Sequence, residues 1–134
     1  MVNITTLGEK MISKIKTFGI NGSEPILVET EVDISSGFPR FEIIGLPDSS
    51  IREAKHRVKT AIQNSQIKLT SKKIIINLSP AEIKKIGSHY DLSIAIGILI
   101  SNKNLDLKKI RSIEKTAFIG ELSLNGDLKP TKGI

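Results

Sequence analysis

The sequence predicts an α+β domain in which a mixed β-sheet carries packed helices. Three segments support this class: residues 25–34 alternate between apolar and polar side chains, residues 48–64 repeat apolar side chains at helical spacing, and residues 72–78 form a β-branched run. The order of elements is strands, helix, strand, helix and hairpin, which is typical of helices packed on one face of a sheet. At 134 residues, the chain suits one domain with a single core.

The strands before the first helix are expected to form a meander. In residues 25–34, the apolar side chains at 26, 28, 32 and 34 share one face and the acidic side chains share the other, as in a half-buried strand. The turn segment SSGFP follows, and residues 40–46 form a second predicted strand that ends before Pro47.

Residues 48–64 form the clearest amphipathic helix. Its start offers Asp48, Ser49 or Ser50 as the N-cap, and Ser50 with Glu53 has the spacing of a capping box. One face is apolar, and a basic side lies beside it, made by Arg52, Lys55, His56 and Lys59. Arg52, Lys55 and Lys59 are candidates to contact phosphates, although a solvated helix face is the commoner explanation of such a stripe.

The next strand and helix are expected to be buried. Residues 72–78 predict a strand at the centre of the sheet, covered on both faces, because the run is apolar and β-branched through its middle. Residues 92–100 predict a helix that is apolar nearly all round, in which Gly97 permits close packing at some cost in helix propensity.

The two ends of the chain are less strongly patterned. Residues 1–10 are polar and aperiodic, and we expect a disordered leader or tag there. The charged segment 101–115 indicates at most a short helix near Leu107. The pair Asn125-Gly126 predicts a two-residue hairpin with a type I′ turn.

The composition limits which classes of partner and which types of site we expect. Twenty Lys and Arg against 14 Asp and Glu give a net charge of +6, which favours anionic partners such as DNA without identifying one. With no cysteine and only His56 and His89, no metal site is expected. Four Phe, one Tyr and no Trp leave little material for stacking on bases. No apolar run reaches about 18 residues, so we expect no membrane partner and a cytoplasmic protein.

Ser88, His89 and Asp91 precede the second predicted helix and raise the question of a nucleophile site. Neighbours on a helix project about 100° apart, so these three side chains cannot converge as a catalytic triad. Ser88 and Asp91 have the spacing of a capping box, so we expect a helix cap and no catalytic residue. The chain has neither a G-x-x-x-x-G-K-[ST] nor a G-x-G-x-x-G motif, so no ATP cradle is expected.

Four sequence blocks occur in the same order as in a known family. They are GLPD at 45–48, NLSPA at 77–81, YDL at 90–92 and GELSLNG at 120–126. With the segments around them, they resemble the amino-terminal domain of the ComM/YifB family of magnesium-chelatase-like AAA+ proteins. That domain is similar to the proteolytic domain of Lon, on the fold of the second domain of ribosomal protein S5. The resemblance implies one Lon-like domain over residues 11–134, truncated before a downstream AAA+ module.

The resemblance also implies what the domain does. Lys85 to Asp91 overlays on the Lon nucleophile loop, with the nucleophile position at His89 and Ser88 one place early. The lysine of the Lon Ser-Lys dyad would fall just past Ile134, so a vestigial, non-catalytic loop is implied.

The other implications concern cofactors and partners. ATP and Mg²⁺ are expected only in the downstream module, and the expected partners are that module and the sister subunits of a hexameric ring. Members of the family are associated with DNA branch migration in natural transformation, so we expect support of ring assembly, DNA engagement or both. The alternatives are a cryptic peptidase near Ser88 and a stand-alone nucleic-acid-binding module.

Overall fold

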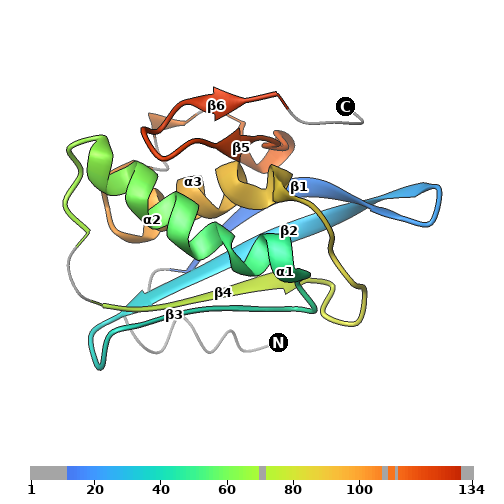
Figure 1. Ribbon diagram of the computed structural model, residues 1–134, viewed down its shortest axis with the longest axis horizontal. Coiled ribbons are helices and arrows are strands. Elements are labelled where there is room, and N and C mark those ends of the chain that lie inside the picture. The colour runs from blue at the N-terminus through green and yellow to red at the C-terminus, as the bar shows by residue number, and fades with distance from the viewer. Residues whose placement is uncertain (1–11, 70–71, 107–108, 111, 131–134) are drawn as a thin grey trace.

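A computed structural model describes residues 12–69, 72–106, 109–110 and 112–130 of the chain. The strands are β1 (Ile12–Asn21), β2 (Glu24–Ser35), β3 (Arg40–Ile44), β4 (Lys73–Ser79), β5 (Glu121–Leu122) and β6 (Leu128–Lys129). The α-helices are α1 (Ser49–Arg52), α2 (Ala54–Asn64) and α3 (Asp91–Ser101), and two 3-10 helices are η2 (Ser88–Tyr90) and η4 (Ile113–Lys115). The predicted α+β class with a mixed sheet and packed helices is confirmed (Figure 1).

The main sheet has the strand order β1-β2-β4-β3. β1 pairs antiparallel with β2, β2 pairs antiparallel with β4, and β3 pairs parallel with β4. The predicted central position of the 72–78 strand is confirmed. The predicted meander is wrong, because β4 inserts between β2 and β3 after the chain has crossed over through α1 and α2. β1 and β3 are therefore the outer strands of this sheet.

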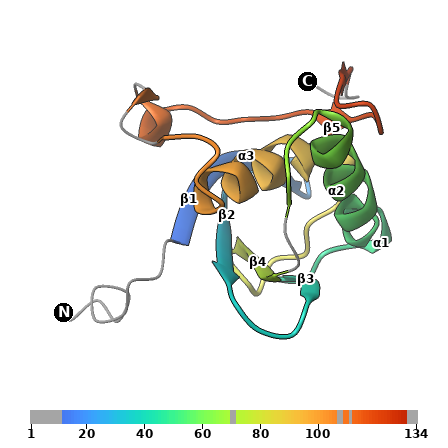
Figure 2. The ribbon, with the colours of Figure 1, turned by 90° about the vertical axis from the view of Figure 1, so that its left-hand side faces the viewer.

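Helices pack on one face of the sheet, and no described helix or strand covers the other, which we call the open face. Both α2 and α3 lie on the same side of the sheet, and the β5–β6 hairpin lies beyond them (Figure 2). In β4, Ile74, Ile76 and Leu78 are buried while the residues between them are half-buried. The expectation that this strand is covered on both faces is therefore wrong. Its outward side chains share the open face with a row of charged groups on β1 and β2, including the Lys14–Glu31 pair at 3.9 Å.

The first predicted helix is broken into two. Asp48 is the N-cap of α1, where its side chain accepts from the Ile51 N–H at 2.9 Å. The capping box expected from Ser50 and Glu53 does not form, since Ser50 instead donates to Asp48 at 2.8 Å. Glu53 separates α1 from α2, and the apolar face continues across this break through Ile51, Ala54 and Val58, all fully buried.

Helix α3 is buried on nearly all sides, as its sequence predicts. A Cβ at Gly97 would stand 2.6 Å from Val32 Cγ2 and 3.2 Å from Ser13 Oγ, so the glycine permits the close approach of α3 to β1 and β2. Ser13 Oγ donates to the Gly97 carbonyl at 2.8 Å. The predicted role of Gly97 in close packing is confirmed.

The C-terminal hairpin differs from its prediction. Ser123 to Asp127 separate β5 from β6, and only Gly126 among them has a positive φ, at 96°. A type I′ turn requires positive φ at both central residues, so the predicted two-residue turn is wrong. The expected leader at 1–10 and the expected helix near Leu107 lie outside the described residues. Within the described part of the chain, no helix has the length and apolar character needed to span a bilayer.

Candidate functional site

The loop from Lys85 to Asp91 is held by hydrogen bonds to distant parts of the chain. Gly87, with φ 114°, precedes η2, and this conformation favours glycine. Neither η2 nor α3 has a side-chain cap among its hydrogen bonds, so the capping box expected from Ser88 and Asp91 is wrong. Both side chains make long-range contacts instead of local ones.

Asp91 forms the most buried ion pair of the described chain. Its carboxylate, with no exposed surface, accepts from Arg57 Nε at 2.7 Å, Arg57 Nη2 at 3.0 Å and the Leu122 N–H at 3.1 Å. Arg57 Nη2 also donates to the Ser50 carbonyl at 2.8 Å. Hydrogen bonding to Asp91 raises the pKa of Arg57, whereas burial raises the pKa of Asp91 against the opposing hydrogen bonds. One pair thus joins α1, α2, α3 and β5.

Lys85 is a buried cation that contacts no carboxylate among the described residues. Its Nζ donates to the Gly45 carbonyl at 2.8 Å and to the Pro80 carbonyl. Burial lowers the pKa of Lys85, and Glu82 partly offsets that effect. The backbone of Lys85 is also tied down, because its N–H donates to Leu46 O and its carbonyl accepts from Asp48 N–H, both at 3.0 Å. The side chain therefore fixes the two loops that flank it.

Ser88 and His89 also have structural partners. Ser88 Oγ donates to the Glu121 carboxylate, and His89 Nε2 lies 2.8 Å from the Phe18 carbonyl, which can only accept. These bonds join the loop to β5 and to the β1–β2 hairpin.

A serine nucleophile needs a base within hydrogen-bond reach and a group that orients the base. In the described chain, Lys85 and His89 contact backbone carbonyls, and Ser88 contacts Glu121. The described chain therefore does not show the triad arrangement, in which a third group orients a base toward the serine. Among the described residues, no three His, Asp or Glu side chains gather closely enough to hold a metal ion.

The basic candidates of the first predicted helix lie on the surface beside strand β3. Arg52, Lys55 and Lys59 are exposed side chains on one side of α1 and α2. Arg52 and Lys55 line a cavity of about 240 Å³ whose other wall is Phe41, Glu42, Ile43 and Ile44 of β3. Lys59 lines the next cavity along, of about 380 Å³.

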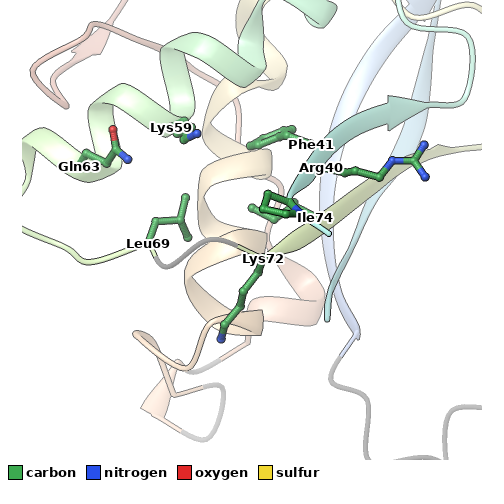
Figure 3. A pocket seen from close by; sticks show the side chains of 8 residues that line it. Arg40, Phe41, Lys59, Gln63, Leu69, Lys72 and Ile74 are labelled. Carbon is green, nitrogen blue, oxygen red and sulfur yellow. The ribbon is translucent and has the colours of Figure 1, made fainter. Parts of the chain in front are cut away.

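The larger cavity adds two cations that the sequence did not single out. It is lined by Pro39, Arg40, Phe41, Lys59, Gln63, Leu69, Lys72 and Ile74 (Figure 3). Lys59 and Gln63 stand on the helix wall, while Phe41 and Ile74 come from neighbouring strands of the sheet (Figure 3). The two cavities lie next to each other and share Phe41, and we call the surface that they form together the β3–α2 groove. The crossover after β3 brings α2 and β4 beside β3, so that Arg40 and Lys72 become part of the lining. No local pattern in the sequence could have indicated that.

Arg57 and Glu121 were also missed from the sequence. Arg57 stands among the basic residues of α2, yet its side chain turns inward to Asp91 and is only 20% exposed. Glu121 lies 33 positions after Ser88, and only the tertiary fold brings the two together.

Known proteins resemble this chain over most of its length. Residues 30–134 match the family described as subunit ChlI of Mg-chelatase. The chain is 41% identical to competence protein ComM of Haemophilus influenzae over 113 residues, which are 84% of this chain and 22% of that protein. It is 43% identical to protein YifB of Escherichia coli over 115 residues, which are 86% of this chain and 22% of that protein. The chain thus spans less than a quarter of the length of these relatives.

Proposed function

The chain belongs to the family of subunit ChlI of Mg-chelatase, and we propose that it is a non-catalytic, Lon-like docking domain at the amino-terminal end of a ComM/YifB-type AAA+ protein. Its fold in this proposal is that of the second domain of ribosomal protein S5, and its role is to support assembly of the ring. The observation that carries the proposal is the engagement of the loop at 85–91, where Lys85, Ser88 and Asp91 all hold other elements together.

In this proposal, the catalytic activity of the whole protein belongs to a part of it outside this chain. ATP and Mg²⁺ bind in the AAA+ module that follows, and the partners of this domain are that module and the sister subunits of a hexameric ring. One relative is named competence protein ComM, and we extend to this chain a place in DNA branch migration during natural transformation.

Incubation with an unfolded protein substrate tests the non-catalytic role. We expect no turnover above that of buffer, and the same result for Ser88→Ala. Turnover by the purified chain that Ser88→Ala abolishes would establish the cryptic peptidase and refute the docking assignment.

DNA engagement is the second candidate function, favoured by the exposed stripe of Arg52, Lys55 and Lys59. Phosphate contacts release counterions, so the logarithm of DNA affinity should fall linearly with the logarithm of salt concentration. If the stripe contacts DNA, the triple reversal Arg52→Glu, Lys55→Glu, Lys59→Glu weakens binding and reduces that slope by roughly one for each lost contact.

A matched control reverses three exposed lysines outside the groove, namely Lys84, Lys109 and Lys129. Both variants lower the net charge by the same amount, so a general charge effect predicts equal losses. DNA engagement by the stripe predicts a larger loss in the first variant. Equal losses, or no binding by the wild-type chain, exclude this second function and leave ring assembly.

A further inference from the structure

The β3–α2 groove follows the open edge of strand β3. Six consecutive residues, 39–44, line its two cavities. Side chains alternate between the faces of a strand, so consecutive residues can line one groove only where it passes along the edge of the strand. β3 is an outer strand of the sheet, and its edge away from β4 has no partner strand among the described residues.

The outward backbone groups of β3 can be assigned from its pairing. The Arg40 N–H donates to the Lys72 carbonyl at 3.4 Å, so Arg40 points its backbone groups at β4. Backbone direction alternates along a strand, and Phe41 and Ile43 therefore point their N–H and C=O groups away from β4, at the open edge. An unpaired edge of this kind is a template for another extended chain.

The helix wall of the groove is positively charged, whereas the Arg40 guanidinium points away from Lys59 (Figure 3). The lining of the groove includes five cations, Arg40, Arg52, Lys55, Lys59 and Lys72, and one carboxylate, Glu42. Glu42 is paired with Arg40. The helix wall, which carries Arg52, Lys55 and Lys59, therefore attracts negative side chains on whatever lies along β3.

We propose that the β3–α2 groove binds an extended acidic segment of a partner polypeptide, which adds to β3 as a further strand. This inference deepens the proposed docking function and rests on it. The donors and acceptors of Phe41 and Ile43 select a peptide, because a phosphodiester backbone offers acceptors but no donors for the outward carbonyls. The cations select carboxylates on the side of the added strand that faces α2.

The spacings on the two walls are compatible. Alternate side chains of a strand stand about 6.6 Å apart, and Lys55 and Lys59 are separated by about 6 Å along the helix axis. Carboxylates at every second position of the added segment can therefore each meet a cation. A segment of about five or six residues would cover the length of β3.

Three fluorescein-labelled heptapeptides of alternating Glu and Val test the proposal on the wild-type chain. One is unmodified, one is N-methylated at its glutamates and one is N-methylated at its valines. An added strand directs every second N–H at β3 and the others at solvent. We expect one methylation pattern to weaken binding at least tenfold and the other to change it little, as measured by fluorescence anisotropy. Amide exchange at Phe41 and Ile43 should slow when the unmodified peptide is bound.

Protein variants test the charge requirement. The Arg52→Glu, Lys55→Glu, Lys59→Glu reversal should weaken binding of the unmodified peptide at least tenfold. Reversal of Lys84, Lys109 and Lys129 should change the affinity for that peptide by less than threefold. Thermal melts of both variants establish that they are folded. The N-methylated peptides test strand addition on the wild-type chain, so that test does not depend on the folding of any variant.

Three outcomes would overturn the proposal. Absence of peptide binding excludes the acidic segment, and equal binding of all three peptides excludes strand addition. In a third arm, a single-stranded oligonucleotide of the same charge competes with the peptide. If it displaces the peptide and binds more tightly than the peptide does, the groove is assigned to nucleic acid. None of these outcomes concerns turnover, so failure here leaves the non-catalytic assignment to be decided by the Ser88 assay.

Discussion

Single buried polar groups determine how many of the helices, strands and loops of this molecule are held together. Asp91 and Lys85 are buried with hydrogen-bond partners, which the energetics of burial requires of charged groups. Tyr90 is the contrast: the residue is 1% exposed, and its hydroxyl is buried with no hydrogen-bond partner in the described chain. The sequence singled out Asp91 but assigned it a local cap, because a pattern of neighbours cannot reveal a partner 34 residues away.

The Tyr90 hydroxyl gives a prediction with a definite pH signature. Burial, with a smaller effect from Asp48, raises the pKa of Tyr90 from 10.0 to about 12. Because the folded state holds this proton more tightly than the unfolded state, the corresponding stability is complete below pH 10 and is lost as pH rises through about 12. At roughly 1.4 kcal/mol per pKa unit, the loss is about 3 kcal/mol.

Tyr90→Phe should remove that loss. We also expect the variant to be as stable as the wild type at pH 7, or more stable by about 1 kcal/mol, because it deletes a buried hydroxyl without a partner. Urea unfolding of both chains between pH 7 and pH 12 provides the measurement. A parallel decline of the two chains above pH 10 would mean that Tyr90 does not govern the alkaline limit.

At the scale of elements, α3 is the centre of the fold. It packs on β1 and β2 through Gly97 and on α2 and β5 through Asp91. Its Ile100 belongs to a small buried cluster with Ile15 and Ile113. The existence and burial of this helix were predictable, because its apolar side chains surround the whole axis. The elements that pack against it were not predictable, because an all-apolar helix has no distinct face from which to infer its orientation.

Gly97→Ala tests the close approach of α3 to the sheet. Alanine improves helix propensity, but its methyl group would stand 2.6 Å from Val32 Cγ2. We expect a net destabilisation of about 1–3 kcal/mol from overpacking. Chemical denaturation should also show that Val32→Ala recovers part of the loss in the Gly97→Ala background. An increase in stability from Gly97→Ala alone would contradict the packing described here.

The two carboxylates that contact Arg57 provide a matched pair of variants. Asp91→Asn leaves the guanidinium partly buried without its ion pair, and we expect a loss of roughly 3 kcal/mol. Glu53 lies 3.6 Å from Arg57 with a side chain that is 69% exposed, so Glu53→Gln should cost less than about 1 kcal/mol. Similar losses in the two variants, measured by urea unfolding, would show that burial does not determine the strength of this pair.

At the scale of the whole molecule, the sequence predicted the strands and helices better than their arrangement. Alternation identified β2, and propensity identified β4, yet neither reveals which strand pairs with which. The insertion of β4 between β2 and β3 therefore came only from the structure. The same crossover creates the β3–α2 groove, where Arg40 and Lys72 join the stripe of Arg52, Lys55 and Lys59. β1 was not predicted as a separate strand, although Ser13 and Thr17 are buried there and Ser13 contacts α3 at Gly97.

Our central proposal is that this domain acts through its surface and that the loop of residues 85–91 performs no chemistry. Intact-mass spectrometry after exposure to a fluorophosphonate probe tests the claim directly, since such probes label serines that a base activates. We predict no mass increase at a probe concentration that fully labels a serine peptidase run in parallel. A stoichiometric adduct that maps to Ser88 and disappears in Ser88→Ala would contradict the account.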